Sequence, residues 1–299
     1  GNSLVIKGAD EAVIIFTAKT DYNLALLNFD RSIAPGAEAD AILEQVATKS
    51  LQQMRDAHIA EHRSMFERVT LDLGGGEAAK MPTDYRLNEV KRGAIDPDLM
   101  ALYFQYGRYL LMGSSRGPSQ LPANLQGIWN DLMWAPWESD FHMNINLQMN
   151  YWPVDVCNLS ETFDPLLNWF VPVTEKARGA AKQLYDTPGW LLFTTSNPFG
   201  HMTPTGSTIK SQFVNGVLDP LAGAWMSVAL FRHYEFTVDR QFLSEIAYPV
   251  LKGAVEFLLD YLVEDTDGQL LIVPTTSPEN SYFHPVTGEA VRITKASTY

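Results

Sequence analysis

The feature that most constrains the fold of this chain is the spacing of its apolar residues between Asp98 and Glu264. Apolar side chains recur at helical spacing in successive segments, and long loops separate these segments. The segments cover residues 99–112, 146–158, 160–185, 220–237 and 239–264. Successive helices joined in this way pack against one another, so the pattern predicts a mainly α-helical fold and favours an α/α toroid.

The beginning of the chain has a different pattern. Residues 4–7 and 12–18 are rich in β-branched side chains and predict two short strands joined by a turn. Two strands are only marginally stable alone, so we interpret residues 1–38 as the end of an N-terminal β-sandwich domain. A helical pattern then runs from Ala39 to about Val69. We interpret residues 39–97 as a connector helix and linker, and residues 98–299 as the first part of a helical catalytic domain.

Charge and composition exclude several kinds of partner. Asp and Glu number 35 against 22 Lys and Arg, and the formal net charge of −13 disfavours nucleic acid and anionic membranes as partners. No apolar run approaches the roughly 18 residues of a membrane span. No His, Cys, Asp and Glu residues have metal-ligand spacing, and no phosphate-binding loop is present, so the sequence predicts no metal and no other cofactor.

The stretch from Ser119 to Pro153 is unusual in composition. It holds four of the seven tryptophans and, between residues 124 and 150, seven side-chain amides, with Glu138, Asp140 and His142 among them. Amides can bind sugar hydroxyls, indole faces pack against pyranose rings, and carboxyl groups transfer protons. Composition alone is equally compatible with a glycan-binding pocket and with a tryptophan-rich core whose amides cap helices.

Asn144 and Asn146 favour the pocket. These two amides lie two residues apart just after His142, and they cannot share one face of a helix. If a helix starts here, both lie on its first turn or in the preceding loop, where a side chain can point into a cavity.

Several motifs occur in a distinctive order along the chain. They are Phe104-Gln-Tyr-Gly-Arg-Tyr-Leu110, Leu121-Pro-Ala-Asn-Leu-Gln-Gly-Ile-Trp129, His142-Met-Asn-Ile-Asn-Leu-Gln-Met-Asn-Tyr-Trp-Pro153, Ala224-Trp225, His233-Tyr-Glu-Phe-Thr-Val-Asp239 and Thr276-Ser-Pro-Glu-Asn280. In sequence and order these motifs resemble glycoside hydrolase family 95, the inverting α-L-fucosidases. The resemblance implies an (α/α)6 toroid, incomplete in this chain, and an exo-glycosidase that hydrolyses terminal α-L-fucosyl linkages of glycans with inversion.

The resemblance also implies roles for individual residues. Glu279 matches the general acid of the family, and Asn144 and Asn146 match the amides that hold the attacking water. His142 matches a position that contacts the sugar, and we expect Trp225 to wall the same pocket. The expected ligand is a fucosylated oligosaccharide or a related α-L-glycoside.

The catalytic base is missing from this pattern. In the family, an Asp well downstream of the acid motif assists the two amides, whereas this chain stops at Tyr299. We therefore expect the 299 residues alone not to hydrolyse fucosides at a useful rate, and a non-catalytic glycan-binding fragment is one alternative. We interpret Asp140 and Glu138, which are close to the amides in sequence, as structural residues.

The chain departs from the family after Gly189-Trp190. The fucosidases carry a His-His-Asn-Thr-Asp-like stretch there, whereas this chain reads Leu191-Leu-Phe-Thr-Thr-Ser-Asn-Pro-Phe199. The family also contains α-L-galactosidases, whose substrate has a hydroxyl where fucose has only a methyl group. A changed set of hydrogen-bonding residues could alter that choice, so an α-L-galactosidase is the second alternative.

Overall fold

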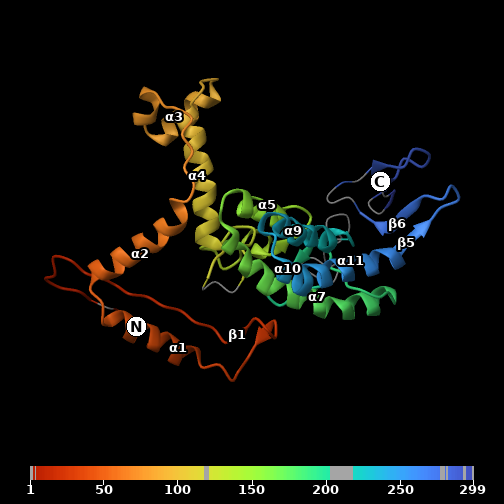
Figure 1. The fold of residues 1–299 in the computed structure, drawn as a ribbon, viewed down its shortest axis with the longest axis horizontal. Coiled ribbons are helices and arrows are strands. Elements are labelled where there is room, and N and C mark those ends of the chain that lie inside the picture. Colours follow the sequence, from red (N-terminus) through yellow and green to blue (C-terminus); the bar gives the residue numbers. More distant parts are fainter. Residues whose placement is uncertain are drawn as a thin grey trace. The chain divides into compact units, whose positions relative to one another are not determined.

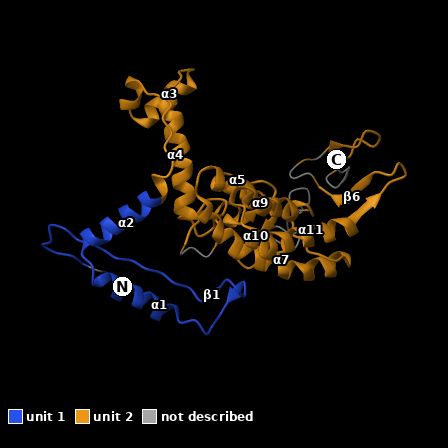
Figure 2. Cartoon of the chain, in the orientation of Figure 1, with its two compact units in different colours: residues 1–64 blue, residues 65–299 orange. Residues whose placement is uncertain are grey.

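The protein is described by a computed structural model that covers residue 3 and residues 5–117, 121–202, 218–276, 280, 282–291 and 294–297. Two compact units divide the chain, residues 1–64 and residues 65–299 (Figure 2). Helices make up most of the regular structure (Figure 1), as the apolar spacing predicted.

The first unit contains little regular structure before its helices. A hairpin pairs β1 (Tyr22–Asn23) with β2 (Asn28–Phe29), and α1 (Pro35–Ala47) and α2 (Leu51–Phe66) follow. The prediction of strands over residues 4–7 and 12–18 was wrong, since the described residues of both segments form no strand. A strand needs a neighbour for its backbone N–H and C=O groups, and among the described residues no segment pairs with these two.

The predicted connector helix is two helices. At the break, the Ser50 hydroxyl oxygen accepts a hydrogen bond from the backbone N–H of Gln53 (3.2 Å), and Gln53 Oε1 accepts one from the backbone N–H of Ser50 (2.8 Å). This reciprocal capping box begins α2 as a new helix. The first helix starts before Ala39, at Pro35, whose fixed φ suits the first helical position.

The second unit contains helices over most of each segment predicted after residue 98, but residues 262–264, predicted as the end of the last helix, form a strand. Its described α-helices are α3 (Thr83–Lys91), α4 (Pro97–Ser114), α5 (Asn146–Tyr151), α6 (Pro153–Val156), α7 (Asp164–Tyr185), α9 (Ala222–Thr237), α10 (Arg240–Phe242) and α11 (Tyr248–Tyr261). The 3-10 turn Glu77–Lys80 precedes α3, and the 3-10 turns Pro136–Ser139 and Ser160–Phe163 and the π-helical turn Leu243–Ala247 lie between later helices. Pro153, which cannot donate a backbone hydrogen bond, separates α5 from α6.

The strands of this unit are short, and each pairs with its neighbour in antiparallel fashion. They are β3 (Phe141–His142), β4 (Thr195–Ser196), β5 (Leu262–Glu264), β6 (Leu270–Thr275), β7 (Tyr282–Phe283), β8 (Ala290–Val291) and β9 (Thr294–Ser297). β3 pairs with β4, β7 pairs with β8, and β6 lies between β5 and β9. The strand predicted over residues 270–273 is confirmed as part of β6.

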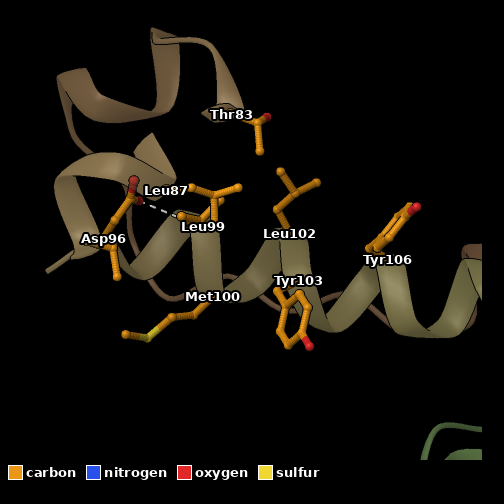
Figure 3. A pocket seen from close by; sticks show the side chains of 9 residues that line it. Thr83, Leu87, Asp96, Leu99, Met100, Leu102, Tyr103 and Tyr106 are labelled. Atoms are coloured by element: carbon orange, nitrogen blue, oxygen red, sulfur yellow. Dashed lines mark hydrogen bonds between the residues drawn. The ribbon is translucent and has the colours of Figure 1, made fainter. Parts of the chain in front are cut away.

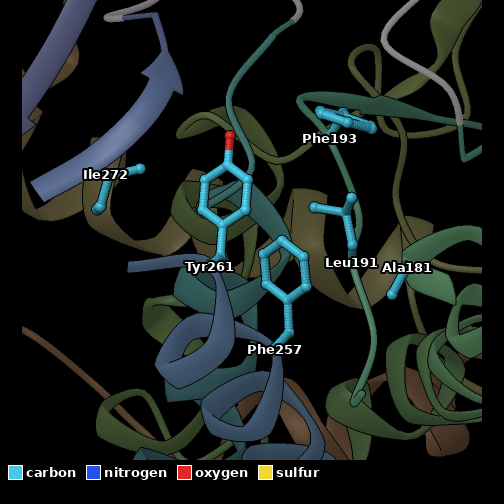
Figure 4. Packing of buried hydrophobic residues seen from close by; sticks show 6 residues of the cluster. All are labelled: Ala181, Leu191, Phe193, Phe257, Tyr261 and Ile272. Carbon is cyan, nitrogen blue, oxygen red and sulfur yellow. The ribbon is translucent and has the colours of Figure 1, made fainter. Parts of the chain in front are cut away.

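A hydrophobic cluster holds the chain segment that leads to β4. Ala181 of α7, Phe257 and Tyr261 of α11 and Ile272 of β6 form one cluster with Leu191 and Phe193 (Figure 4), and all six side chains are buried. Burying one aromatic or aliphatic side chain of this size stabilises the folded state by roughly 1.5–3 kcal/mol. The cluster therefore fixes the segment immediately before Thr195.

An ion pair and an apolar groove mark the junction of α3 and α4. Arg86 Nε and Nη2 donate to the two Asp96 carboxylate oxygens, both at 2.8 Å, and Asp96 caps α4 by accepting from the backbone N–H of Leu99 (Figure 3). Beside them lies an open groove of about 610 Å³. It is lined by Thr83, Leu87, Val90, Asp96, Leu99, Met100, Leu102, Tyr103 and Tyr106. No described residue of the Ser119–Pro153 stretch lines this groove.

Candidate active site

The candidate site is built on the short ladder between β3 and β4. His142 lies directly opposite Thr195, and Phe141 lies opposite Ser196. The backbone N–H of Met143 extends the ladder by donating to the carbonyl of Thr194 at 2.6 Å. Directly opposite side chains of an antiparallel pair lie on the same face of the sheet, so His142 and Thr195 share one face.

Asn144 and Asn146 flank the start of α5. Asn146 is the first residue of the helix, and Asn144 lies in the turn before it. Gln148 Nε2 reaches back from the helix and donates to the carbonyl of Met143 at 2.6 Å. The arrangement agrees with the sequence prediction that both amides lie on the first turn of a helix or in the loop before it.

Most of the amides in this stretch have structural roles. Five of the seven make side-chain hydrogen bonds within the stretch: Asn124, Gln126, Asn130, Gln148 and Asn150. The side chains of Asn144 and Asn146 make no hydrogen bond to any described residue, and Asn144 Oδ1 is nevertheless buried. These two amides therefore keep their hydrogen-bonding capacity for a water molecule or a ligand.

The tryptophans of the stretch do not form a core. Their exposed fractions range from 48% to 87% for Trp129, Trp134, Trp137 and Trp152. The buried tryptophans are Trp169 and Trp190, which lie outside the stretch. The alternative of a tryptophan-rich core is therefore wrong for this part of the sequence.

A strained turn leads into β3. Trp137, Glu138 and Ser139 all have positive φ values, of 49°, 53° and 52°. Residues with side chains rarely adopt this region, at a cost of order 1–3 kcal/mol each, and such strain persists only where surrounding contacts impose it. One such contact is the Ser139 hydroxyl, which donates to Gln126 Oε1 at 2.5 Å. The turn leads directly into Asp140, the residue that precedes β3.

The charges around His142 are coupled. Burial raises the pKa of Asp140 to about 6, and the nearby charge of Glu138 raises it further, while His201 opposes the shift. Burial lowers the pKa of His142, and the charge of Glu138 opposes that shift. His142 is therefore a neutral imidazole near pH 7, with one hydrogen-bond donor and one acceptor.

Trp225 lies on α9. Its side chain, 42% exposed, borders a pocket of about 400 Å³ between α5–α6 and α9. Gln148 and Trp152 border the same pocket, whereas Asn144, Asn146 and His142 do not. Gln148 borders this pocket, and its amide also holds the turn that carries Asn144. That Trp225 walls the pocket of the asparagines stays a prediction.

Glu279 lies outside the described residues, together with Ser277 and Pro278. The chain just before them is held firmly: both the backbone N–H and the hydroxyl of Thr276 donate to the carbonyl of Leu218, at 2.9 and 2.7 Å. That Glu279 converges with the two asparagines therefore stays a prediction.

Sequence reasoning missed two residues at this site. Gln148 was counted only as one amide among seven, although its position two residues after Asn146 inside the same motif was a usable signal. Thr195 carried no signal of its own, because its relation to His142 arises only from the pairing of β3 with β4.

In the part of the chain that the structure describes, no three His, Cys, Asp or Glu residues come together as a group able to hold a metal ion. Among the same residues, no helix combines the length and apolar character that crossing a membrane requires.

Comparison with known proteins supports the family that the motifs indicate. Residues 50–299 match the glycosyl hydrolase family 95 catalytic domain. The chain is 34% identical over 305 residues to Alpha-L-fucosidase 2 of Arabidopsis thaliana, a match that covers 100% of this chain and 35% of that protein. It is 35% identical over 288 residues to Probable alpha-fucosidase A of Aspergillus niger, covering 92% of this chain and 35% of the relative. The chain thus spans about a third (35%) of the length of these relatives.

Proposed function

The chain belongs to glycosyl hydrolase family 95, and we propose that it is part of an exo-glycosidase that hydrolyses terminal α-L-fucosyl linkages of glycans with inversion. One observation carries the proposal. Of the seven amides between residues 124 and 150, only Asn144 and Asn146 keep side chains without a hydrogen bond to a described residue. These are the two amides that the mechanism requires. The names of the two relatives support fucose as the sugar.

The proposed mechanism divides the chemistry between two sides of the sugar. Glu279 is the general acid that protonates the glycosidic oxygen as the bond to the leaving group breaks, and water attacks the anomeric carbon from the opposite face. Asn144 and Asn146 orient this water: an amide oxygen accepts from it and an amide N–H donates to it. A neutral amide is too weak a base to take the proton, so a carboxylate must do so.

His142 binds the sugar in this proposal. Because burial keeps its imidazole neutral near pH 7, it can donate to one sugar hydroxyl and accept from another. A protonated imidazole would offer only donors. The same stretch also exposes Trp129, Trp134, Trp137 and Trp152, whose faces can pack against further sugar rings.

We also infer the finer architecture from the family. The helices from α4 onward form part of an (α/α)6 toroid, which is supported by the packing of α11 against α9 and α7 and of α5 against α9. We also propose the domain order inferred from the sequence: residues 1–38, which contain the β1–β2 hairpin, end an N-terminal β-sandwich domain, residues 39–97 connect, and residues 98–299 begin the catalytic domain.

An α-L-galactosidase is the second candidate, and one observation favours keeping it. The segment 191–199, where the sequence departs from the fucosidases, contains β4 and therefore lies against the strand of His142. The change in hydrogen-bonding residues is thus adjacent to the candidate site.

The experiment that tests the proposal uses the full-length protein to which this chain belongs. Aryl α-L-fucoside and aryl α-L-galactoside are offered separately, and the first-formed anomer is followed by proton NMR. We expect a higher kcat/KM for the fucoside and β-L-fucose as the first product. A higher kcat/KM for the galactoside would favour the second candidate, and retained α-configuration would contradict the mechanism. Sugar binding without turnover would favour a non-catalytic glycan-binding protein.

A further inference from the structure

We propose that Thr195 is a substrate-binding residue whose hydroxyl group hydrogen-bonds a hydroxyl of the sugar beside His142. The inference rests on the proposed function and extends it to a residue in the segment that departs from the fucosidase pattern. Three features of the structure carry it: the register of the ladder, the burial pattern along it, and the unsatisfied hydroxyl of Thr195.

The register places Thr195 beside His142. The two residues are direct partners in the antiparallel ladder of β3 and β4. Side chains of direct partners lie on one face of a sheet with Cβ atoms about 4.5–5.5 Å apart. A sugar hydroxyl within reach of the imidazole is therefore within reach of the Thr195 side chain.

Burial along the ladder identifies which face is open. Phe141 and Ser196, the neighbouring pair, are 2% and 0% exposed. The Phe141 ring packs edge-on against the Trp169 ring, with 4.6 Å between the two ring centroids. Successive side chains of a strand alternate between faces, so the face of Phe141 and Ser196 belongs to the core. His142 and Thr195 are each partly exposed, on the opposite face.

The hydroxyl of Thr195 has no partner in the described protein. Thr195 Oγ1 is buried and makes no hydrogen bond to any described residue, and the same holds for Asn144 Oδ1. Leaving a buried polar atom unsatisfied costs about 1–3 kcal/mol. A ligand hydroxyl that enters beside His142 would satisfy Thr195 Oγ1, which can both donate and accept.

Two neighbouring hydroxyls provide an internal comparison. Thr194 Oγ1 and Ser196 Oγ are also buried without a described partner, but their residues are 2% and 0% exposed. Ser196 lies on the core face of the ladder, so its hydroxyl cannot reach a ligand bound beside His142. Thr194 is buried about as deeply as Ser196. Because Thr194 has the same side chain as Thr195, it is a matched control for Thr195.

The ligand class follows from the chemistry of the pair. A neutral imidazole and an aliphatic hydroxyl bind neutral hydroxyl groups, as in a monosaccharide, and they offer no charge to an anion. A site that hydrogen-bonds a substrate hydroxyl strongly rejects an analogue that lacks it. Thr195 should therefore distinguish the sugar from one of its deoxy derivatives.

The test compares Thr195→Val, Thr195→Ser and Thr194→Val in the full-length protein. Each is assayed with an aryl α-L-fucoside and with its 2-, 3- and 4-deoxy analogues. For Thr195→Val we expect kcat/KM on the parent fucoside to fall about tenfold, with a much smaller loss on one of the deoxy analogues. Thr195→Ser keeps the hydroxyl and should restore most of the activity, and Thr194→Val should match the unsubstituted protein.

Several results would overturn the inference. One is a loss that is equal on the parent and on all three deoxy analogues; another is an equal loss in Thr194→Val. Thermal unfolding of each variant monitors folding, and Thr195→Ala replaces Thr195→Val if the valine variant does not fold. If the unsubstituted protein neither hydrolyses nor binds the fucoside, the proposed function fails and the inference with it. If it is active and Thr195→Val is equally active, only the inference fails.

Discussion

Gly189 lies against Gly253 of helix α11 so closely that a β-carbon added to Gly189 would come within 2.1 Å of the Gly253 carbonyl oxygen. The same oxygen accepts a hydrogen bond from the backbone N–H of Trp190 at 3.2 Å, and Trp190 Nε1 donates to the carbonyl of Val250 at 2.8 Å. This contact anchors the start of the segment that leads to β4 and contains Thr195. The candidate site thus depends on a backbone approach that only glycine permits.

Gly189→Ala should destabilise the protein by more than about 2 kcal/mol, because the new methyl group overlaps backbone atoms of α11 and Gly189 has a φ of +72°. Urea denaturation measures the change in the free energy of unfolding. Gly179→Ala is the control: it lies within α7, and a β-carbon there meets nothing within 4 Å. That variant should be stabilised by roughly 0.5–1 kcal/mol. Equal stability of the two variants would contradict the close contact.

Asp155→Ala should cost about 2–4 kcal/mol of unfolding free energy, since it leaves two donors without an acceptor. The Asp155 carboxylate accepts from His233 Nδ1 at 2.9 Å and from the Ser160 hydroxyl at 2.8 Å, and it links α6 to α9. Asp267→Ala removes an exposed carboxylate and should change stability by less than about 0.5 kcal/mol. A similar small effect in both variants would show that the link contributes little.

Asp140→Asn should stabilise the protein at pH 8 and have little effect at pH 4. The pKa of Asp140 is about 6 in the folded protein against an ordinary 3.8, so the folded state holds the proton more tightly than the unfolded state. The contribution of Asp140 to stability is therefore complete below about pH 4 and is lost as the pH rises through 6.

For a partly exposed carboxyl group we expect a gain of about 1–2 kcal/mol at pH 8. Thermal unfolding of Asp140→Asn and of the unsubstituted protein at both pH values measures it. Asp131→Asn, an exposed control, should have little effect at either pH. A gain that is the same at pH 4 and pH 8 would rule out titration of Asp140 as its cause.

Glu279→Gln in the full-length enzyme should lower kcat by several orders of magnitude on a natural fucosyl glycan, whose poor leaving group needs protonation. An aryl fucoside with an activated leaving group needs little protonation and should lose far less. Steady-state kinetics on both substrates measures the difference. Equal losses on the two would remove Glu279 from the role of general acid.

Asn144→Ala and Asn146→Ala should each lower kcat about a hundredfold, and equally on the natural fucosyl glycan and on the aryl fucoside. The attacking water must be oriented whatever the leaving group. Asn130→Ala is the matched control, since that amide donates to the carbonyl of Leu132 within its own loop. It should leave kcat unchanged. If Asn130→Ala were as damaging as the other two, the loss would reflect the loop rather than the water.

The sequence predicted most of the helical framework and indicated a candidate site. Helical spacing is a local property, and α4, α7, α9 and α11 lie where it was strongest. The capping box at Ser50 and Gln53 was also local and could have been read from the sequence, yet the long apolar pattern concealed the break. The β-rich beginning was misread because strand formation needs a partner segment, and composition does not reveal one.

By itself, then, the sequence determined the helices, the family motifs and the pairing of two asparagines with a histidine, because each of these depends on residues close together in the chain. Only the tertiary structure decided which amides remain available, which tryptophans are exposed and which residue faces His142. Five amides make hydrogen bonds within the stretch, and Thr195 lies opposite His142 through a strand pairing between distant segments. The physical reason is that hydrogen-bond satisfaction and burial depend on what the folded chain brings together in space.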